Sequence, residues 1–423
     1  MSRRHPLELP LATALLVAAA TRFAYLGEHM TSPFFGIAIL DEAWYDGMAR
    51  ALLGGGGAPD ASFRPLLYPL FLAAAYRLGG PYDTLAAVGL QHLLGLATTA
   101  LVVLIAARLF RRPWAGGAAG LLYALAGPPL YFEGERLLTT LFTFLATLLL
   151  WLLARAEAAT RPRWWWLAAG GCWGLAALAR PNVLILLPAF FWAAWRRRRR
   201  GAAAGEATAA VVMPLAAALL VLATAAALQA PYAGGFQLLG GAGGVNLYLG
   251  NRRGADGMTP RQDRYAAYSH QYADTVQLFA EEEYRLARRR AGDRPAERPP
   301  AGAVNRYWLA RTVEEVRTAP AAWAALMGRK TLLLLHDGEI PNNKSYSFVL
   351  AEESALLRRL PVRWWLLLAL APLGVMAARR GGDRAVLRWV LAFAVLYGLS
   401  IVAFFVNGRF RIPLWPALAV LAG

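Results

Sequence analysis

Two adjacent carboxylates, Asp41 and Glu42, stand directly before a stretch that is amphipathic on a helical period, Ala43–Leu53. Four glycines, Gly54–Gly57, follow it and predict the end of that helix. An acidic residue at a helix start often caps free backbone N–H groups. The same carboxylate, placed beside a hydroxyl group, can accept its proton as a general base. The local pattern leaves both interpretations open for Asp41.

A metal centre is a weaker interpretation of these residues. Two adjacent carboxylates do not make a divalent-cation site by themselves, and their loop holds no Asp-x-Asp pattern. The five histidines show no spacing typical of metal ligands. We therefore assign no metal ligand; the sequence does not support a divalent metal and leaves metal dependence open.

Cationic side chains that can meet a phosphate lie in three places. Arg64 follows the carboxylate pair in the same loop, Lys330 ends an amphipathic stretch, and Arg409 and Arg411 precede the last apolar segment. Arginine can hold two phosphate oxygens with its planar fork, whereas lysine acts as a point charge. For Arg64 and Arg409 we favour phosphate binding. For Lys330 and Arg411, simple contact with lipid headgroups is an equal alternative.

The elements that must position these residues are membrane helices. The chain has 423 residues, of which 58% are hydrophobic and only 17% charged, a composition outside that of ordinary soluble domains. Apolar segments near the length of a bilayer crossing recur along it, and in lipid such segments must be helical. The net charge of +18 forms no stripe with interleaved aromatics, so nucleic-acid binding is not expected.

Basic residues between the apolar segments predict the topology. Counted from an anchor at about 7–26, every second break is rich in arginine, which places the N-terminus and these breaks in the cytoplasm. Candidate spans are 84–109, 114–131, 137–153, 164–179, 183–195, 207–228, 363–377 and 385–406, and 412–423 is shorter than a full crossing. The run Arg196–Arg200 is better explained as a topology signal than as a lipid site.

Three regions follow from this topology. Residues 1–229 form a transmembrane module whose first extracytoplasmic loop, 27–82, carries Asp41. Residues 230–362 form a large polar extracytoplasmic loop or small domain, with interfacial pieces such as Tyr307–Leu335. Residues 363–423 return to the membrane, and either the chain ends inside the bilayer or the protein continues beyond it.

Two more acids and one arginine lie near the predicted membrane boundary. Glu133 and Glu135 are at the outer end of a span, where flanking charges and contacts to a sugar or acceptor are about equally plausible. Arg22, inside the first apolar run, either snorkels to the interface or has a functional role.

Several motifs, in this order and topology, resemble one membrane enzyme family. They are Asp41-Glu42 with its helix, Phe63-Arg64-Pro65-Leu66-Leu67-Tyr68-Pro69, Leu178-Ala179-Arg180-Pro181, Asn246-Leu247-Tyr248-Leu249-Gly250-Asn251, and Arg409-Phe410-Arg411-Ile412-Pro413. The sequence is similar to GT-C glycosyltransferases of the protein O-mannosyltransferase and lipid A aminoarabinose transferase type, and thus resembles glycosyltransferase family 39. Pro65 is followed by Leu66, where that family more often has a second proline.

The resemblance implies a bundle of transmembrane helices with extracytoplasmic interfacial helices. It also implies inverting transfer of a sugar from a polyprenyl-phosphate donor to a hydroxyl of a glycan, lipid or protein. Asp41 would be the general base and Glu42 would orient it or the acceptor. Arg64, Arg409, Arg411 and Lys330 would bind the donor phosphate, and Glu133, Glu135, Tyr68 and Asn246 the sugar or acceptor. We expect a multi-pass protein of the bacterial inner membrane with its site on the extracytoplasmic face.

Two alternatives remain open at this point. A transporter or flippase of lipid-linked glycans would place its polar residues near the membrane midplane on broken helices, whereas here they gather in two outward loops. A glycan ligase or polymerase that uses a pyrophosphate carrier is a closer competitor. The Asp41-Glu42 pair favours transfer of a single sugar.

Overall fold

The computed structural model describes residues 7–56, 63–233, 235–259, 272–297 and 299–423. In these ranges the chain is helical, and its one extended pairing is an isolated parallel bridge between Ala126 and Val362. This confirms the all-α class expected of a polytopic membrane protein. The helices long and apolar enough to cross a membrane are α1 (Glu8–Thr31), α4 (Asp83–Phe110), α7 (Thr139–Ala158), α10 (Ala204–Ala233) and α18 (Arg384–Ala403).

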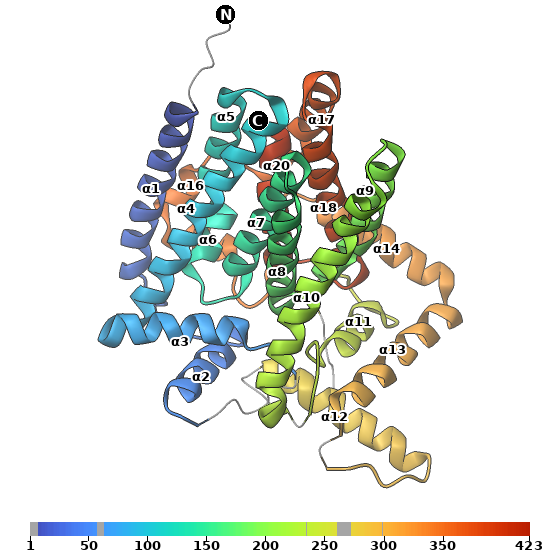
Figure 1. The fold of residues 1–423 in the computed structure, drawn as a ribbon. Coiled ribbons are helices and arrows are strands. Elements are labelled where there is room, and N and C mark those ends of the chain that lie inside the picture. Colours follow the sequence, from blue (N-terminus) through green and yellow to red (C-terminus); the bar gives the residue numbers. More distant parts are fainter. Residues whose placement is uncertain (1–6, 57–62, 234, 260–271, 298) are drawn as a thin grey trace, which may run out of the picture.

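Shorter helices pack between these five and complete the bundle (Figure 1). They are α5 (Pro113–Ala124), α6 (Gly127–Gly134), α8 (Arg163–Ala179), α9 (Leu187–Arg199), α17 (Trp364–Gly381) and α20 (Leu414–Ala422). A 3₁₀ turn, η2 (Pro181–Leu186), joins α8 to α9.

The first-loop helices lie across the lower end of the bundle in Figure 1. They are α2 (Asp41–Leu53) and α3 (Leu67–Gly79), and the 3₁₀ turn η1 (Gly80–Tyr82) leads from α3 into α4. The turn before α2 is tight, since Leu40 has a positive φ of 54°. The helix therefore begins at Asp41, as the sequence predicts.

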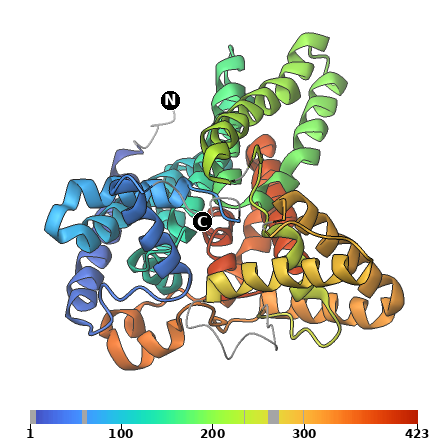
Figure 2. The ribbon, with the colours of Figure 1, turned by 90° about the horizontal axis from the view of Figure 1, so that it is seen from below.

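The long polar region also gathers at this end, which Figure 2 shows from below. Its helices are α11 (Gly243–Asn251), α12 (Tyr272–Arg290), α13 (Ala301–Thr318) and α14 (Pro320–Leu335). The chain then returns to the bundle through α15 (Tyr346–Phe348), η3 (Val349–Glu353) and α16 (Ala355–Arg359), and α19 (Gly408–Arg411) later precedes α20.

Proline divides three segments that we expected to be continuous. The predicted span 114–131 consists of α5 and α6, because Pro128 and Pro129 open a new helix at an extended Ala126. The predicted span 183–195 begins as the 3₁₀ turn η2 and becomes α-helical only at Leu187. Likewise 307–335 breaks at Ala319, before Pro320. Hydropathy is insensitive to such breaks because the interrupting residues are themselves apolar.

Two hydrophobic clusters hold these parts together. The larger fills the bundle and includes Tyr346 and Leu357, so the end of the long region packs on the membrane helices. The smaller joins α11, α12 and α13 around Trp308 and includes Phe63 from the first loop. The first loop and the long region are therefore packed against each other, which places residues of both beside Asp41.

Candidate active site

Asp41 is the first residue of α2, and its carboxylate is paired with two arginines. One oxygen lies 2.7 Å from a terminal guanidinium nitrogen of Arg64 and the other 2.5 Å from that of Arg409. The residue is only 4% exposed. The N-cap position of α2 is Leu40, which makes no side-chain cap, and both Asp41 oxygens take part in ion pairs, which favours a role for Asp41 other than capping.

The two arginines come from opposite ends of the chain. Arg64 precedes α3, and its guanidinium lies over the ring of Trp44 at 5.2 Å. Arg409 lies in α19, whose first turn is capped by the Asn407 side chain accepting from the Phe410 N–H. Burial alone would raise the pKa of Asp41, but the two guanidinium groups hold that pKa well below its usual range.

A third guanidinium, that of Arg180, reaches the same place from the turn between α8 and η2. Arg180 is 6% exposed and donates to the hydroxyls of Tyr397 and Thr139 and to the carbonyl of Arg409. Its guanidinium also lies 4.5 Å from the ring centre of Phe410. These partners are all neutral. Arg180 belongs to the Leu178-Ala179-Arg180-Pro181 motif, from which we predicted no role for it.

A cavity of about 560 Å³ opens beside these charges and is lined by Asp41, Arg64, Arg180 and Arg409. Its other walls combine apolar side chains with carboxamides. The carboxamides are Asn182, Gln237, Asn246, Asn305 and Asn342. Among the described lining residues, one acidic and three cationic side chains therefore meet in a chamber whose other polar groups are neutral.

Tyr68 and Asn246 are both on the cavity wall, as the prediction of sugar or acceptor contacts requires. The Tyr68 hydroxyl donates to the Gln91 amide oxygen at 2.9 Å, and its ring packs edge-on against Tyr45. The Asn246 amide donates to the Ala242 carbonyl. Their place on the wall agrees with that prediction, which still awaits a test.

Glu42 and Glu135 are joined behind Asp41 by Lys344. The Lys344 ammonium lies 2.9 Å from a Glu42 oxygen and 2.5 Å from a Glu135 oxygen. Burial and the Glu135 charge raise the pKa of Glu42 above its usual range, although Lys344 opposes this. Neighbouring Asn343 accepts from Arg409 at 3.3 Å, so this segment connects the two ionic groups.

Lys344 is the residue that sequence reasoning missed. It has no motif around it, and it lies more than 200 positions from the acids that it bridges. One signal was available, since Lys330 and Lys344 are the two lysines of a chain with 44 lysines and arginines.

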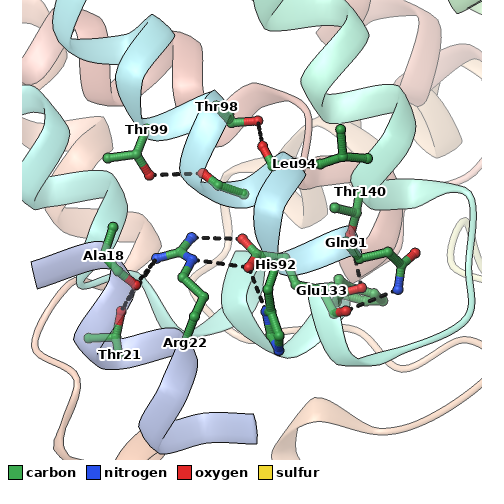
Figure 3. Close-up of polar contacts among 12 residues, drawn as sticks. Ala18, Thr21, Arg22, Gln91, His92, Leu94, Thr98, Thr99, Glu133 and Thr140 are labelled. Carbon is green, nitrogen blue, oxygen red and sulfur yellow. Dashed lines mark hydrogen bonds and ion pairs between the residues drawn. The ribbon is translucent and has the colours of Figure 1, made fainter. Parts of the chain in front are cut away.

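Glu133 lies inside the bundle and is absent from the cavity wall (Figure 3). Its carboxylate accepts from Arg22 of α1, with contacts of 2.7 and 3.1 Å, and meets the His92 ring of α4 at 3.0 Å. Glu133 therefore lies neither in the cavity, where a sugar contact would put it, nor at the exposed end of a span, where a flanking charge would lie. Arg22 does not snorkel to the interface either, because it is buried against Glu133.

Lys330 and Arg411 also lie away from the cavity wall. The Lys330 ammonium donates to the Asn251 amide oxygen at 3.1 Å and to the Phe404 carbonyl at 2.6 Å, and burial lowers its pKa to about 7. Arg411 donates to the carbonyls of His336 and Gly338 and pairs with Glu339 at 2.9 Å. Both cations are occupied by protein groups, so we omit them from the phosphate site.

In the described part of the chain, no three His, Cys, Asp or Glu side chains group together as metal ligands would.

One family model matches the chain over residues 63–228, that of the dolichyl-phosphate-mannose-protein mannosyltransferases. A search of curated proteins found no matching sequence. The matched segment holds Arg64, Tyr68, Glu133, Glu135 and Arg180, and it stops short of Arg409.

Solved structures provide the likeness over the whole length. The oligosaccharyltransferase of Archaeoglobus fulgidus in complex with Zn and sulfate is similar over 98% of this chain and 48% of its own, at 12% identity and a TM-score of 0.54. The same enzyme with a tethered acceptor peptide is similar over 98% of this chain and 48% of its own, at 13% identity and a TM-score of 0.53. This chain thus spans about half the length of those enzymes.

The match to ArnT from Cupriavidus metallidurans bound to undecaprenyl phosphate extends over 98% of this chain and 76% of the ArnT chain, at 15% identity. Its TM-score of 0.40 is too low to carry an argument. The helical arrangement shared with the oligosaccharyltransferase gives this chain a fold like that of GT-C membrane glycosyltransferases, and its residues 63–228 are similar to the dolichyl-phosphate-mannose-protein mannosyltransferases.

Proposed function

We propose that this protein transfers a sugar from a polyprenyl-phosphate donor to an acceptor hydroxyl, with inversion at the anomeric carbon. The observation that carries the proposal is the cavity in which the carboxylate of Asp41 meets the guanidinium groups of Arg64, Arg180 and Arg409. A sugar phosphate needs cations for its phosphate, and a hydroxyl nucleophile needs a base.

The charge balance of the reaction fits these groups. The acceptor oxygen forms a bond to the anomeric carbon while the bond from that carbon to the phosphate oxygen breaks. The acceptor proton passes to Asp41, and the phosphate leaves with one more negative charge than it had as a diester. Three fixed guanidinium groups stabilise this developing charge in a site largely shielded from water. Arg180, whose described partners are all neutral, is free to bind the phosphate without losing an ion pair.

Asp41 is a weak base while both arginines hold it, because its pKa is strongly lowered. A donor phosphate that draws Arg64 and Arg409 toward itself would weaken both ion pairs and raise that pKa. We therefore propose that donor binding itself turns Asp41 into an effective base. The arrangement would also limit proton abstraction in the absence of donor.

The sugar is proposed to be uncharged. Among the described residues of the cavity wall, Asp41 is the single acidic side chain, and arginines already pair with it. An amino sugar would bring a further positive charge into a chamber with a cationic surplus. Carboxamides such as Asn182, Asn246 and Asn305 suit hydroxyl groups, since each offers both a donor and an acceptor.

The membrane and its sidedness complete the proposal. Arginine alternation supports the proposal that the cavity lies on the extracytoplasmic face of a bacterial inner membrane. Reporter fusions at Gly56 and Gly292 should then behave as extracytoplasmic, and one at Gly201 as cytoplasmic. A cytoplasmic signal from the Gly56 fusion would contradict this orientation.

The test is transfer by the purified full chain in nanodiscs. Radiolabelled sugars on polyprenyl phosphate and on polyprenyl pyrophosphate are supplied with glycan, lipid and peptide acceptors, and products are separated by chromatography. We expect transfer of a neutral sugar from the monophosphate donor. Arg180→Ala should weaken polyprenyl-phosphate binding, whereas Arg317→Ala, which removes an exposed charge on α13, should not.

Transfer from the pyrophosphate donor alone would replace the proposal by a ligase or polymerase. A neutral-sugar donor that is neither bound nor used, under conditions where the protein is folded, would overturn it.

A further inference from the structure

A groove with an arginine-rich mouth lies between α9 and α18. It has a volume of about 800 Å³ and is lined by Arg196, Arg379, Arg384 and Arg388. In Figure 1, α9 and the α17–α18 turn extend to the upper end of the molecule, opposite α2 and α3. The groove is therefore remote from the cavity at Asp41.

The charges at this mouth are unbalanced. Arg196 and Arg388 both lie over the ring of Trp192, at 5.4 and 5.7 Å, so their like charges are close together. The Nε of Arg196 is buried without a hydrogen-bond partner in the described part of the chain. Clustered guanidinium groups of this kind attract an anion that relieves their repulsion.

Two acids near the cluster, Glu157 and Asp383, offset its charge only in part, because each already pairs with another arginine. Glu157 pairs with Arg197 at 3.2 Å and accepts from the Trp389 indole. Asp383 pairs with Arg108 at 3.3 Å and caps the first turn of α18. The surplus positive charge therefore remains at the mouth of the groove.

Beyond the arginines, the groove is apolar. Leu387, Leu391, Val395 and Leu396 follow one another along α18, and Val395 is 56% exposed. Membrane helices end in water at about this level, so a ligand here faces a charged mouth and a hydrocarbon wall. That combination matches a phosphate head joined to acyl chains and does not match a soluble anion.

We propose that this groove binds an anionic glycerophospholipid from the leaflet at this end of the bundle. Its phosphate contacts the arginines around Trp192, and one acyl chain lies along the α18 residues. A topology signal needs only net positive charge at this end. A topology signal does not require that arginines stack on one tryptophan above an apolar groove, and this arrangement favours a bound lipid.

The experiment is native mass spectrometry of the full chain in detergent, titrated with phosphatidylglycerol or phosphatidylcholine of the same acyl chains. We expect selective binding of phosphatidylglycerol. The double variant Arg196→Ala/Arg388→Ala should lower that affinity about tenfold or more. The control Arg155→Ala/Arg163→Ala removes the same charge from the α7–α8 turn, where Arg155 stacks on Trp151 and Trp165, and should leave the affinity unchanged.

A second variant tests the acyl-chain part and does not depend on the arginines. Val395→Trp, at an exposed position of the groove wall, should weaken phosphatidylglycerol binding while leaving the melting temperature of the protein unchanged. Equal binding of the two lipids, or equal losses in the test and control variants, would overturn the proposal. So would phosphatidylglycerol affinity that survives both test variants. Sugar transfer is not needed for any of these measurements, so the outcome is independent of the proposed function.

Discussion

Asp41 and Glu133 are both buried carboxylates, and each meets two basic side chains that come from distant elements. Asp41 is held by Arg64 and Arg409, and Glu133 by Arg22 and His92. They differ in access. Asp41 lines the cavity together with Arg180, whereas Glu133 is enclosed by α1, α4 and α6.

The close packing around Glu133 shows in its contact with α4. A Cβ atom at Gly95 would lie 2.1 Å from a Glu133 oxygen, so there is no space for a ligand there. Ion pairing and burial are therefore common to both groups and do not identify a reaction site. An adjoining cavity with surplus cations is what distinguishes Asp41 from Glu133, and it is the reason that we propose the reaction site there.

The sharpest test of this comparison is Asp41→Asn. We expect transfer to fall by about two to four orders of magnitude, since the general base is lost. Binding of polyprenyl phosphate should be retained or become tighter, because Arg64 and Arg409 no longer pair with a carboxylate. The measurements are single-turnover transfer and, separately, donor affinity. Normal turnover in this variant would remove Asp41 from the chemistry and make Glu42 or Glu135 the next candidate.

Glu133→Gln should produce the opposite pattern. Breaking a buried ion pair leaves Arg22 uncompensated and costs about 3–5 kcal/mol of stability, while the transfer rate per folded molecule stays close to normal. Denaturation of the purified protein measures the first effect and transfer at low temperature the second. The paired replacement Arg22→Met/Glu133→Leu should recover stability, because no charge is then left buried. A folded Glu133→Gln protein without activity would contradict the comparison.

Arg64→Ala should raise the donor concentration needed for half-maximal transfer about tenfold or more, because a charged hydrogen-bond donor to the phosphate is lost. Arg64→Lys should recover only part of the loss, since charge returns without the planar fork. Initial rates against donor concentration provide the measurement. The matched control is Arg317→Ala, and a similar shift in that variant would show that general charge, and not the site, is responsible.

The smallest expected effect concerns the pH dependence of stability. Glu42 has a raised pKa in the folded chain, so it stabilises the fold fully below the pKa of an exposed glutamate, about 4.3. That stability is lost as the pH rises through the raised pKa. Glu42→Gln should therefore flatten the fall in melting temperature between about pH 5 and pH 8, by roughly 2 °C or more.

Thermal scans at several pH values measure this slope. Glu314→Gln on the exposed face of α13 is the control and should keep the wild-type slope. An unchanged slope in Glu42→Gln would show that the titration of Glu42 does not contribute.

The sequence alone was sufficient for the long membrane helices and for the start of α2, which depend on neighbouring residues. Hydropathy over a bilayer length predicts α1, α4, α7, α10 and α18, because a helix in lipid must satisfy its own backbone. The start of α2 at Asp41 follows from local signals too. Helix breaks such as the one at Pro128-Pro129 were missed, because these prolines interrupt backbone hydrogen bonding within an apolar segment.

Tertiary structure alone decided which charges meet. Asp41 and Arg409 are 368 positions apart, and Lys344 lies 209 positions after Glu135, so no local pattern links them. The sequence predicted that Arg409, Arg411 and Lys330 lie on the same side of the membrane, which does not say where each side chain points. Packing then turned Arg409 toward Asp41 and turned Arg411 and Lys330 toward backbone carbonyls. Ion-pair partners are chosen by where side chains point after the helices pack, and that information is spread over the whole chain.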